Sequence, residues 1–352
     1  MILPTTASAV WILAIVSLLC LGSWANSLKL AGKWRFEYFY YDFVFGILLC
    51  AGVAALALGS GRPQELTFQD NLLLTSKRDM AWALGSGVVL NLGMLLLLAS
   101  MTIAGMSVAF PLTLGVALVI GAIWDFANAT QANTPLTFIG VALLAGAVVV
   151  SVVTYMRLLR VRREVAQKAL TPDPRIKSKR QKSAGATLVI ILSVVGGIAL
   201  STFPKLLDEA TSGDNALAPY SAVMLLSVAA LLSSPFFVLF FTTFPVVSAT
   251  GMPPGYLAGS GKQHLMGLAG GIVWGTGMLT GLMTTGAPRI LQPSTLIQYV
   301  LSNGALVVAA AWGLLAWREL RGGGDRVRML ATGMMVLFLA GLGLVAFAFS
   351  QK

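Results

Sequence analysis

Long apolar segments recur along the whole chain, and they limit its fold more than any other feature of the sequence. Each is about 20 residues long, which is the length an α-helix needs to cross the hydrocarbon core of a bilayer. A membrane β-barrel would instead need short strands of alternating hydrophobicity. The sequence therefore predicts an all-α integral membrane protein with ten transmembrane helices. The segments lie at 9–30, 40–59, 80–100, 103–124, 135–157, 184–206, 217–245, 264–286, 293–316 and 326–349.

The composition supports a membrane location. Hydrophobic residues make up 57% of the 352 residues and charged residues only 11%, which is more apolar surface than a water-soluble core of this size can hide. Cys20 and Cys50 both lie inside apolar segments, where a free thiol behaves as a small hydrophobe, so no disulfide is expected. No basic residue precedes the first segment, which favours a retained helix over a cleaved signal peptide.

Two parts of the sequence resemble each other. SGVVLNLGML at Ser86–Leu95 aligns without a gap with GGIVWGTGML at Gly270–Leu279, and PLTLGVALVIGAI from Pro111 resembles VLSNGALVVAAAW from Val300. The aligned segments are the third of each group of five, and an odd number of helices per copy places the copies in opposite orientations. The prediction is a 5+5 inverted-topology repeat of the kind found in transporters. Its parts are a first repeat at 1–157, a basic linker at 158–183 and a second repeat at 184–352.

Positive charge is concentrated in the linker between the two predicted repeats. Ten Lys and Arg residues stand against two acidic residues between positions 157 and 182, and the whole chain carries a net charge of +11. Eighteen of the Lys and Arg residues fall on one predicted side of the membrane and six on the other. The positive-inside bias accounts for this better than nucleic-acid binding. The linker, in which TPDP indicates flexibility, is therefore predicted to be cytoplasmic and both termini to lie outside.

Three ionisable residues are candidates for binding a coupling ion. Asp42 lies within the second apolar segment, where a charged group is costly and tends to face a cavity or bind an ion. Glu37 has the same potential role, or it pairs with Lys33 or Arg35 at the interface. His264, the only histidine, either switches its charge near neutral pH or serves as a structural hydrogen-bonding group.

Asp125 ends the fourth segment. This position at a helix end favours capping or a surface role over a role in a binding site.

Glycines and one tryptophan mark the third and eighth segments. Gly87, Gly93, Gly271 and Gly277 let helices approach closely, or they let a solute pass near the backbone. Trp274 lies among glycines near the predicted midplane. Its flat face either stacks on a sugar ring or heterocycle, or packs in the core.

Several stretches together resemble a known family. GSWANSLKL and KWRFEYFYYDFVFG near the start, with His264 and GGIVWGTG late in the chain, resemble the drug/metabolite transporter superfamily, in particular the branch of glucose/ribose porters, the rhamnose–proton symporter and ureide permeases. The resemblance implies alternating access and a central cavity lined by the first, third, fourth, sixth, eighth and ninth helices. The sixth segment departs from the pattern, with Pro204 and Lys205 where the first has SWANSLKL. The implied solute-binding positions are Trp24, Asn26, Asn91, Thr113, Trp274, Thr276, Ser302 and Asn303.

The leading functional hypothesis is a secondary active transporter for a small neutral polar solute, first of all a sugar, in a bacterial inner membrane. Its expected partners are the solute, H⁺ or Na⁺ and the lipid bilayer, in a monomer or homodimer. A ureide, nucleobase or other metabolite permease or exporter of the same fold is the alternative. No GxxxxGK[ST] motif is present, so ATP hydrolysis by that route is not expected. An integral-membrane enzyme would need converging acid, base or metal ligands, so no catalytic residue, cofactor or metal is expected.

Overall fold

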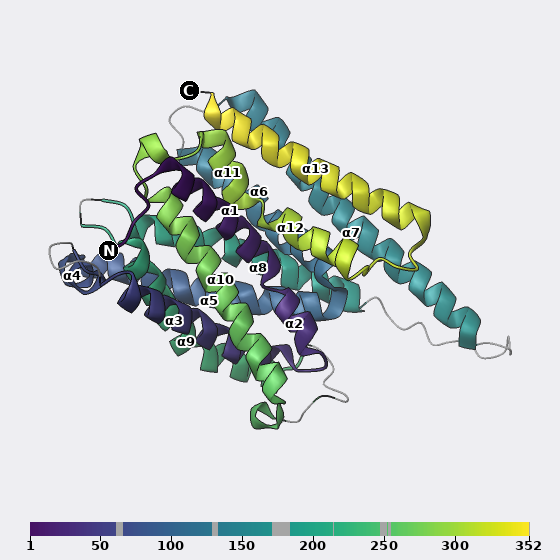
Figure 1. The fold of residues 1–352 in the computed structure, drawn as a ribbon. Coiled ribbons are helices and arrows are strands. Elements are labelled where there is room, and N and C mark those ends of the chain that lie inside the picture. The colour runs from purple at the N-terminus through teal and green to yellow at the C-terminus, as the bar shows by residue number, and fades with distance from the viewer. Residues whose placement is uncertain are drawn as a thin grey trace.

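The computed structural model describes residues 1–60, 66–128, 133–170, 184–213, 215–246, 252 and 255–351, and this part of the chain is all helical (Figure 1). The stretch Thr171–Pro174 and the rest of the linker up to 183 lie outside the described residues. The helices are α1 (Ala7–Ser23), α2 (Asn26–Ala31), α3 (Phe36–Ala57), α4 (Phe68–Leu74), α5 (Lys77–Ala104), α6 (Met106–Asn128), α7 (Thr134–Leu170), α8 (Ala184–Ala210), α9 (Pro219–Thr243), α10 (Gly261–Thr285), α11 (Thr295–Asn303), α12 (Ala305–Ala311) and α13 (Gly324–Ser350), with the short turns η1 (Tyr256–Ala258), η2 (Arg289–Leu291) and η3 (Trp312–Ala316).

Helix lengths confirm a multi-pass helical membrane protein. Among the described residues, eight helices are long and apolar enough to cross a bilayer, and the bent pair formed by α11 and α12 with η3 would make nine. Helix α1 is apolar but shorter, with 17 residues. The ten-helix inverted repeat therefore stays a prediction.

Helix boundaries differ from the predicted ones at four places. Helix α4 was not predicted, and it is closed by a capping box between Thr67 and Asp70. The first and ninth predicted segments are each interrupted, after Ser23 and at Gly304. Helix α7 continues through the first part of the predicted linker to Leu170, because Arg and Glu are good helix formers and apolar residues still recur there. Position 157, where the fifth segment was predicted to end, therefore lies inside this helix.

Polar side chains explain the break between α1 and α2. Ser27 Oγ donates to the carbonyl of Trp24 at 2.7 Å, and Asn26 Nδ2 donates to the carbonyl of Ser23 at 2.8 Å. Such local bonds compete with the regular helical ladder. The chain therefore turns beside Trp24 while its backbone groups remain paired.

The packing partners of the two groups of helices correspond to each other. Helix α5 packs against α8 and α9, while α10, which carries the resembling sequence, packs against α1 and α3. Helix α6 likewise contacts α8, and α12 contacts α1. Helices α7 and α13 lie along each other at one edge (Figure 1). The third long helix of each group thus packs against the first two long helices of the other group, which is the arrangement expected of a duplicated chain.

The aligned glycines lie where these helices meet. A Cβ on Gly87 would fall 2.3 Å from the carbonyl oxygen of Leu226 in α9, and one on Gly271 would fall 1.9 Å from that of Phe43 in α3. A Cβ on Gly93 would likewise meet Leu200 of α8, and one on Gly277 would meet Cys20 and Leu21 of α1. Close helix packing, rather than passage of a solute, is therefore the role of these glycines.

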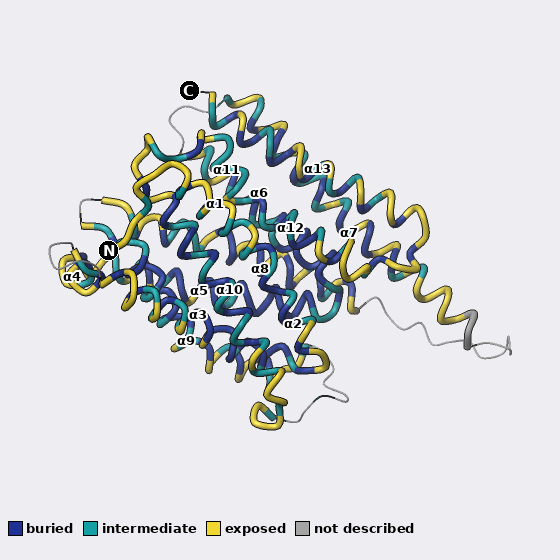
Figure 2. The backbone as a smooth tube through the Cα atoms, viewed as in Figure 1, coloured by how far each residue is buried: buried dark blue, intermediate teal, exposed yellow. Residues whose placement is uncertain are grey.

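Burial separates a central core from a lipid-facing shell. Dark buried stretches gather in the middle of the bundle, and exposed ones follow its outer helices and ends (Figure 2). Helix α9 shows this pattern, with Leu226 buried and Phe236 and Leu239 exposed by 76% and 67%. Exposed side chains this large and apolar fit a lipid environment.

Gly271→Ala should destabilise the bundle by about 1–3 kcal/mol, because the added methyl group overlaps the backbone of α3. Thermal unfolding of purified protein in detergent measures the effect. Gly85→Ala is the matched control, since nothing lies within 4 Å of its added Cβ. A Gly271→Ala protein as stable as this control would contradict the packing argument.

Candidate functional site

A cavity of about 220 Å³ lies at the centre of the bundle. Residues of α1, α5, α6, α8, α10, α11 and α12 line it, together with Trp24 in the break after α1. In chain order these are the first, third, fourth, sixth, eighth and ninth apolar segments, the set that the family resemblance implies. We refer to this space as the central cavity.

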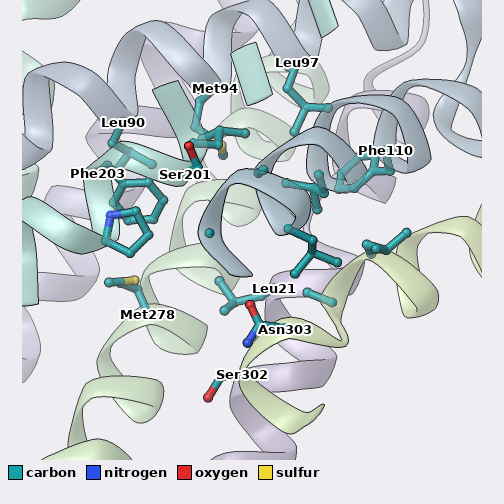
Figure 3. Close-up of a pocket in the computed structure, with 18 of the residues that line it drawn as sticks. Leu21, Leu90, Met94, Leu97, Phe110, Ser201, Phe203, Met278, Ser302 and Asn303 are labelled. Carbon is teal, nitrogen blue, oxygen red and sulfur yellow. The ribbon is translucent and has the colours of Figure 1, made fainter. Parts of the chain in front are cut away.

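Apolar side chains form most of the walls of the central cavity. Leu90, Met94 and Leu97 of α5 line it together with Phe110 of α6, and Met278 of α10 lies across from Leu90 (Figure 3). Aligned positions of the two resembling segments contribute together, since Leu90 aligns with Trp274 and Met94 with Met278, and all four line the cavity. The walls therefore suit the apolar face of a solute.

Polar groups gather at one end of the central cavity. Asp125 of α6, Lys205 of α8, and Ser302 and Asn303 of α11 all contribute to the lining there. The same four residues also line a second space of about 560 Å³, the vestibule, which continues to Arg289 beyond the end of α10. The central cavity is thus connected through its polar end to the outer ends of the helices.

The charges along this route cancel. Asp125 and Asp208 carry two negative charges, and Lys205 and Arg289 carry two positive charges, among the residues that line the two spaces. Lys205 Nζ forms an ion pair with Asp125 Oδ1 and lies 4.0 Å from Asp208 Oδ2. A solute entering here meets strong local dipoles but no net charge.

Four of the eight predicted solute-binding residues line the central cavity. They are Trp24, Trp274, Ser302 and Asn303. Trp24 is held by Phe43 and Phe110, with ring centroids 4.8 and 6.0 Å away. Trp274 is 4% exposed and contacts the same Phe43 edge to face at 6.4 Å. Each tryptophan therefore serves at once in core packing and in the cavity wall.

Asn91 is not part of the cavity lining. Its Nδ2 donates to the carbonyl of Ala230 at 2.9 Å and to the hydroxyls of Ser233 and Ser234 at 2.6 and 3.3 Å, all in α9. The residue is fully buried. Asn91 thus joins α5 to α9, the contact at which Gly87 brings the same two helices together.

Asn26, Thr113 and Thr276 also point away from the central cavity. Asn26 Oδ1 accepts a hydrogen bond of 2.7 Å from Trp317 Nε1, and Thr276 lies against Cys50 of α3 at 3.5 Å. Thr113 is fully buried where α6 meets the glycines of α8. Sequence position alone could not separate these from the lining residues, because both kinds are polar and lie on the same helices.

At the end opposite the vestibule, Glu319 ties three segments together. Its carboxylate accepts hydrogen bonds from the backbone N–H groups of Met106 and Ser107 at 3.0 and 2.6 Å, and it pairs with Lys29 Nζ at 2.5 Å. A negative group at the N-terminus of α6 also complements the helix dipole. Gly105, at φ +87°, leaves room for the carboxylate, since a Cβ there would lie 2.8 Å from it. We call this contact the Glu319 latch.

Asp42 and His264 meet near the same end of the bundle. Asp42 Oδ2 lies 2.9 Å from His264 Nδ1, and its Oδ1 accepts a hydrogen bond from the Tyr256 hydroxyl. Burial and then the bond to Asp42 raise the pKa of the Tyr256 phenol, which therefore stays protonated and donates. Trp34 packs against both rings. Two of the three predicted coupling-ion residues are thus brought together.

The third, Glu37, lies apart from this pair. It is 2% exposed and forms a bidentate ion pair with Arg35, at 3.0 and 3.3 Å. Of the two readings offered by the sequence, the structure shows pairing with a basic neighbour. A buried carboxylate held this way is not free to bind an ion.

The sequence reasoning missed two features of the site. Asp125 was expected to cap a helix or face the surface, yet it lines the central cavity with Lys205. A lysine next to a proline inside an apolar segment was the available signal, because charges within membrane helices tend to mark solute or ion pathways. The role of Glu319 has no local sequence signal, since its partners lie far away in the chain.

No protein-family model matches the chain, and no curated protein matches it. Among the described residues, no group of three or more His, Cys, Asp or Glu side chains could hold a metal ion. The site is therefore interpreted from its own geometry.

Glu319→Gln should loosen the latch, because it removes the charge that pairs with Lys29 and caps α6. In a background with Cys20→Ala and Cys50→Ala, Leu97→Cys reports access to the cavity. Thiol labelling of this cysteine from the linker side should become about tenfold faster in Glu319→Gln, the equivalent of about 1.4 kcal/mol. Asp325→Asn, a change to a fully exposed carboxylate at the same end, should leave the rate unchanged. Equal rates in both variants would refute a latch.

Proposed function

We propose that the protein is a secondary active transporter that moves a small neutral polar solute across the membrane by alternating access. The observation that carries the proposal is a central cavity, built from six apolar segments, that connects to one end of the bundle while the Glu319 latch joins segments at the other. A solute site reached from one side at a time is what alternating access requires. A sugar is the first candidate solute, as the family resemblance implies.

The packing of the helices supports an inverted repeat of ten crossings. The glycines of α5 and α10 meet corresponding partners, and aligned residues line one cavity. The N-terminus lies beside the end of α3, where the Ile2 amide donates to the carbonyl of Leu58, whereas Lys29 in α2 reaches the latch at the opposite end. Helices α1 and α2 together then make one crossing, which would place both termini on the vestibule side.

Charge supports an orientation for this bundle. The latch end carries the basic part of α7, including Arg162, whose guanidinium donates to the Glu319 carbonyl at 2.6 Å. The positive-inside rule would make this end cytoplasmic. The structure would then represent an outward-facing state, with the vestibule open to the outside.

Asp42 and His264 are the best candidates for the coupling site, and a proton is the ion that fits them. Both Asp42 oxygens face groups that can donate hydrogen bonds, the Tyr256 hydroxyl and the His264 ring. A sodium ion would instead require a shell of oxygen ligands. Because the pair joins α3 to α10 near the latch end, its protonation would be linked to opening of that end.

Other functions find less support. The alternative solutes of the same transporter class, a ureide, a nucleobase or another metabolite, also fit a cavity with a tryptophan wall and few polar groups, and export is as compatible with the geometry as uptake. An enzyme would need reactive groups converging on one point. The cavity instead brings together one ion pair, Ser201, Ser302 and Asn303 amid apolar side chains.

Asp42→Asn should abolish the accumulation of labelled glucose driven by a pH gradient in proteoliposomes while preserving solute exchange, because exchange needs no net proton movement. Glu209→Gln, a change to an exposed carboxylate of α8, should keep both activities. If wild-type vesicles take up no sugar or other metabolite under a pH or sodium gradient and convert one chemically instead, the transporter proposal fails. Normal accumulation by Asp42→Asn would remove Asp42 from coupling.

Trp274→Leu, which introduces the residue found at the aligned position 90, should weaken glucose binding about tenfold. The loss combines removed contact area with an aromatic contribution of about 0.5–1.5 kcal/mol. Titration calorimetry of purified protein measures it, with Trp11→Leu, a change to an exposed tryptophan of α1 outside the lining, as a control. Unchanged affinity in Trp274→Leu would show that the indole is only a packing group.

A further inference from the structure

A partly buried ion pair lies at the boundary between the central cavity and the vestibule. The Lys205 ammonium contacts the Asp125 carboxylate, and their side chains are 23% and 31% exposed. Both residues line both spaces. A solute that moves from the vestibule to the tryptophan wall therefore passes this pair.

The contact between Lys205 and Asp125 leaves some of their hydrogen-bond donors and acceptors free. An ammonium group has three N–H donors, and the contact with Asp125 Oδ1 occupies one of them. The other carboxylate oxygen of Asp125 retains its lone pairs. A partly buried ion pair is favourable only when such remaining groups are also satisfied. The pair thus presents a strong acceptor next to a strong donor.

We propose that Asp125 and Lys205 form the polar clamp of the solute site and bind neighbouring hydroxyl groups of a neutral, sugar-like solute. This inference rests on the transport function proposed above. Asp125 accepts a hydrogen bond from one hydroxyl, and Lys205 donates to the next one along the ring. A hydroxyl group is both donor and acceptor, so adjacent hydroxyls match the two halves of the clamp without breaking the ion pair.

The surrounding charges select against solutes with a single charge. An anion attracted by Lys205 would also meet Asp125 and Asp208, and a cation attracted by Asp125 would also meet Lys205 and Arg289. Either solute would disturb a set of charges that now cancels. A neutral solute uses the clamp at no such cost.

The rest of the lining favours a hydroxylated ring over a zwitterion. Ser302 and Asn303 on α11 (Figure 3) add neutral polar groups to the lining that also includes Asp125 and Lys205. Asn303 Nδ2 already donates to the Tyr299 carbonyl at 3.0 Å, but its side-chain oxygen and the Ser302 hydroxyl can still bind further hydroxyl groups, which a sugar supplies and a simple zwitterion lacks. A sugar carries hydroxyls around its edge and apolar C–H groups on its faces, which match Trp24, Trp274 and the aliphatic walls.

Binding of glucose and of its monodeoxy analogues to the purified full chain tests the clamp. Tryptophan fluorescence provides the signal, since Trp24 and Trp274 lie in the cavity wall. Asp125→Asn and Lys205→Gln should each weaken glucose binding about 10- to 100-fold, the range for hydrogen bonds to charged groups. Glu209→Gln should bind as wild type does.

The analogues identify the contact directly. The wild type should lose affinity for at least one analogue that lacks a clamped hydroxyl, and Asp125→Asn should lose less affinity for that same analogue, because the charged acceptor is already replaced by a weaker neutral one. The clamp is refuted if the loss of affinity for every monodeoxy analogue, relative to glucose, is the same in the wild type and in Asp125→Asn. Thermal unfolding confirms that each variant is folded, and Asp125→Asn combined with Lys205→Gln avoids leaving one charge unpaired.

Two further outcomes separate this inference from the function on which it rests. The clamp alone is refuted if wild-type protein binds and transports glucose, but the affinity lost with each monodeoxy analogue does not depend on Asp125. Wild-type protein that neither binds a sugar nor takes one up in proteoliposomes refutes the sugar-like solute together with the clamp. Binding of alanine in place of sugars shows a zwitterion site and also overturns the proposal.

Discussion

Backbone hydrogen bonding in an environment without water is the constraint on which this bundle depends. Lipid offers no partner to an N–H or C=O group, so an interruption in a spanning helix is tolerated only where protein or a cavity lies beside it. Three interruptions border the central cavity: the turn beside Trp24, the bend at Gly304, and Pro204 inside α8. Proline cannot donate to the carbonyl four residues earlier, which belongs to Leu200 in the cavity wall. The irregular backbone and the candidate site therefore occupy the same region.

Close packing of the remaining helices gives this irregular centre a rigid frame. Gly87 and Gly271 bring α5 onto α9 and α10 onto α3 at backbone contact distance, and Asn91 adds hydrogen bonds to one of these contacts. Small residues serve this purpose in membranes because helix association there depends on van der Waals packing. Helices α1, α8, α11 and α12 carry the breaks and the proline that border the cavity, so they are the less regular part of the bundle.

The two ends of the bundle differ in the kind of interaction that joins the helices. At the latch end, Glu319 combines an ion pair with two hydrogen bonds to the N-terminus of α6, and Trp312 and Trp317 donate to the chain around the break after α1. At the vestibule end, the pair of Asp125 and Lys205 faces open space instead. Polar contacts of this sort can exchange partners with water, which densely packed apolar contacts cannot do.

Much of the fold was predictable from the sequence, and less of the site. Segment length and apolar character predicted a multi-pass helical bundle, and the resemblance between the third and eighth segments predicted where glycines would bring helices together. Polar residues on the same helices could not be sorted in this way. Asn91 and Thr113 were predicted to bind a solute but face other helices, whereas Asp125 was predicted to cap a helix or face the surface and instead lines the cavity.

The sequence by itself determined that the chain forms membrane helices and which of them resemble each other, because hydropathy and close glycine packing are properties of short segments. The tertiary structure alone decided which polar groups share a space. Glu319 meets Lys29 and Met106, and Asp125 meets Lys205, across long separations in the chain. The direction of a side chain around a helix that is apolar on all sides depends on its packing partners, and no local pattern encodes those partners.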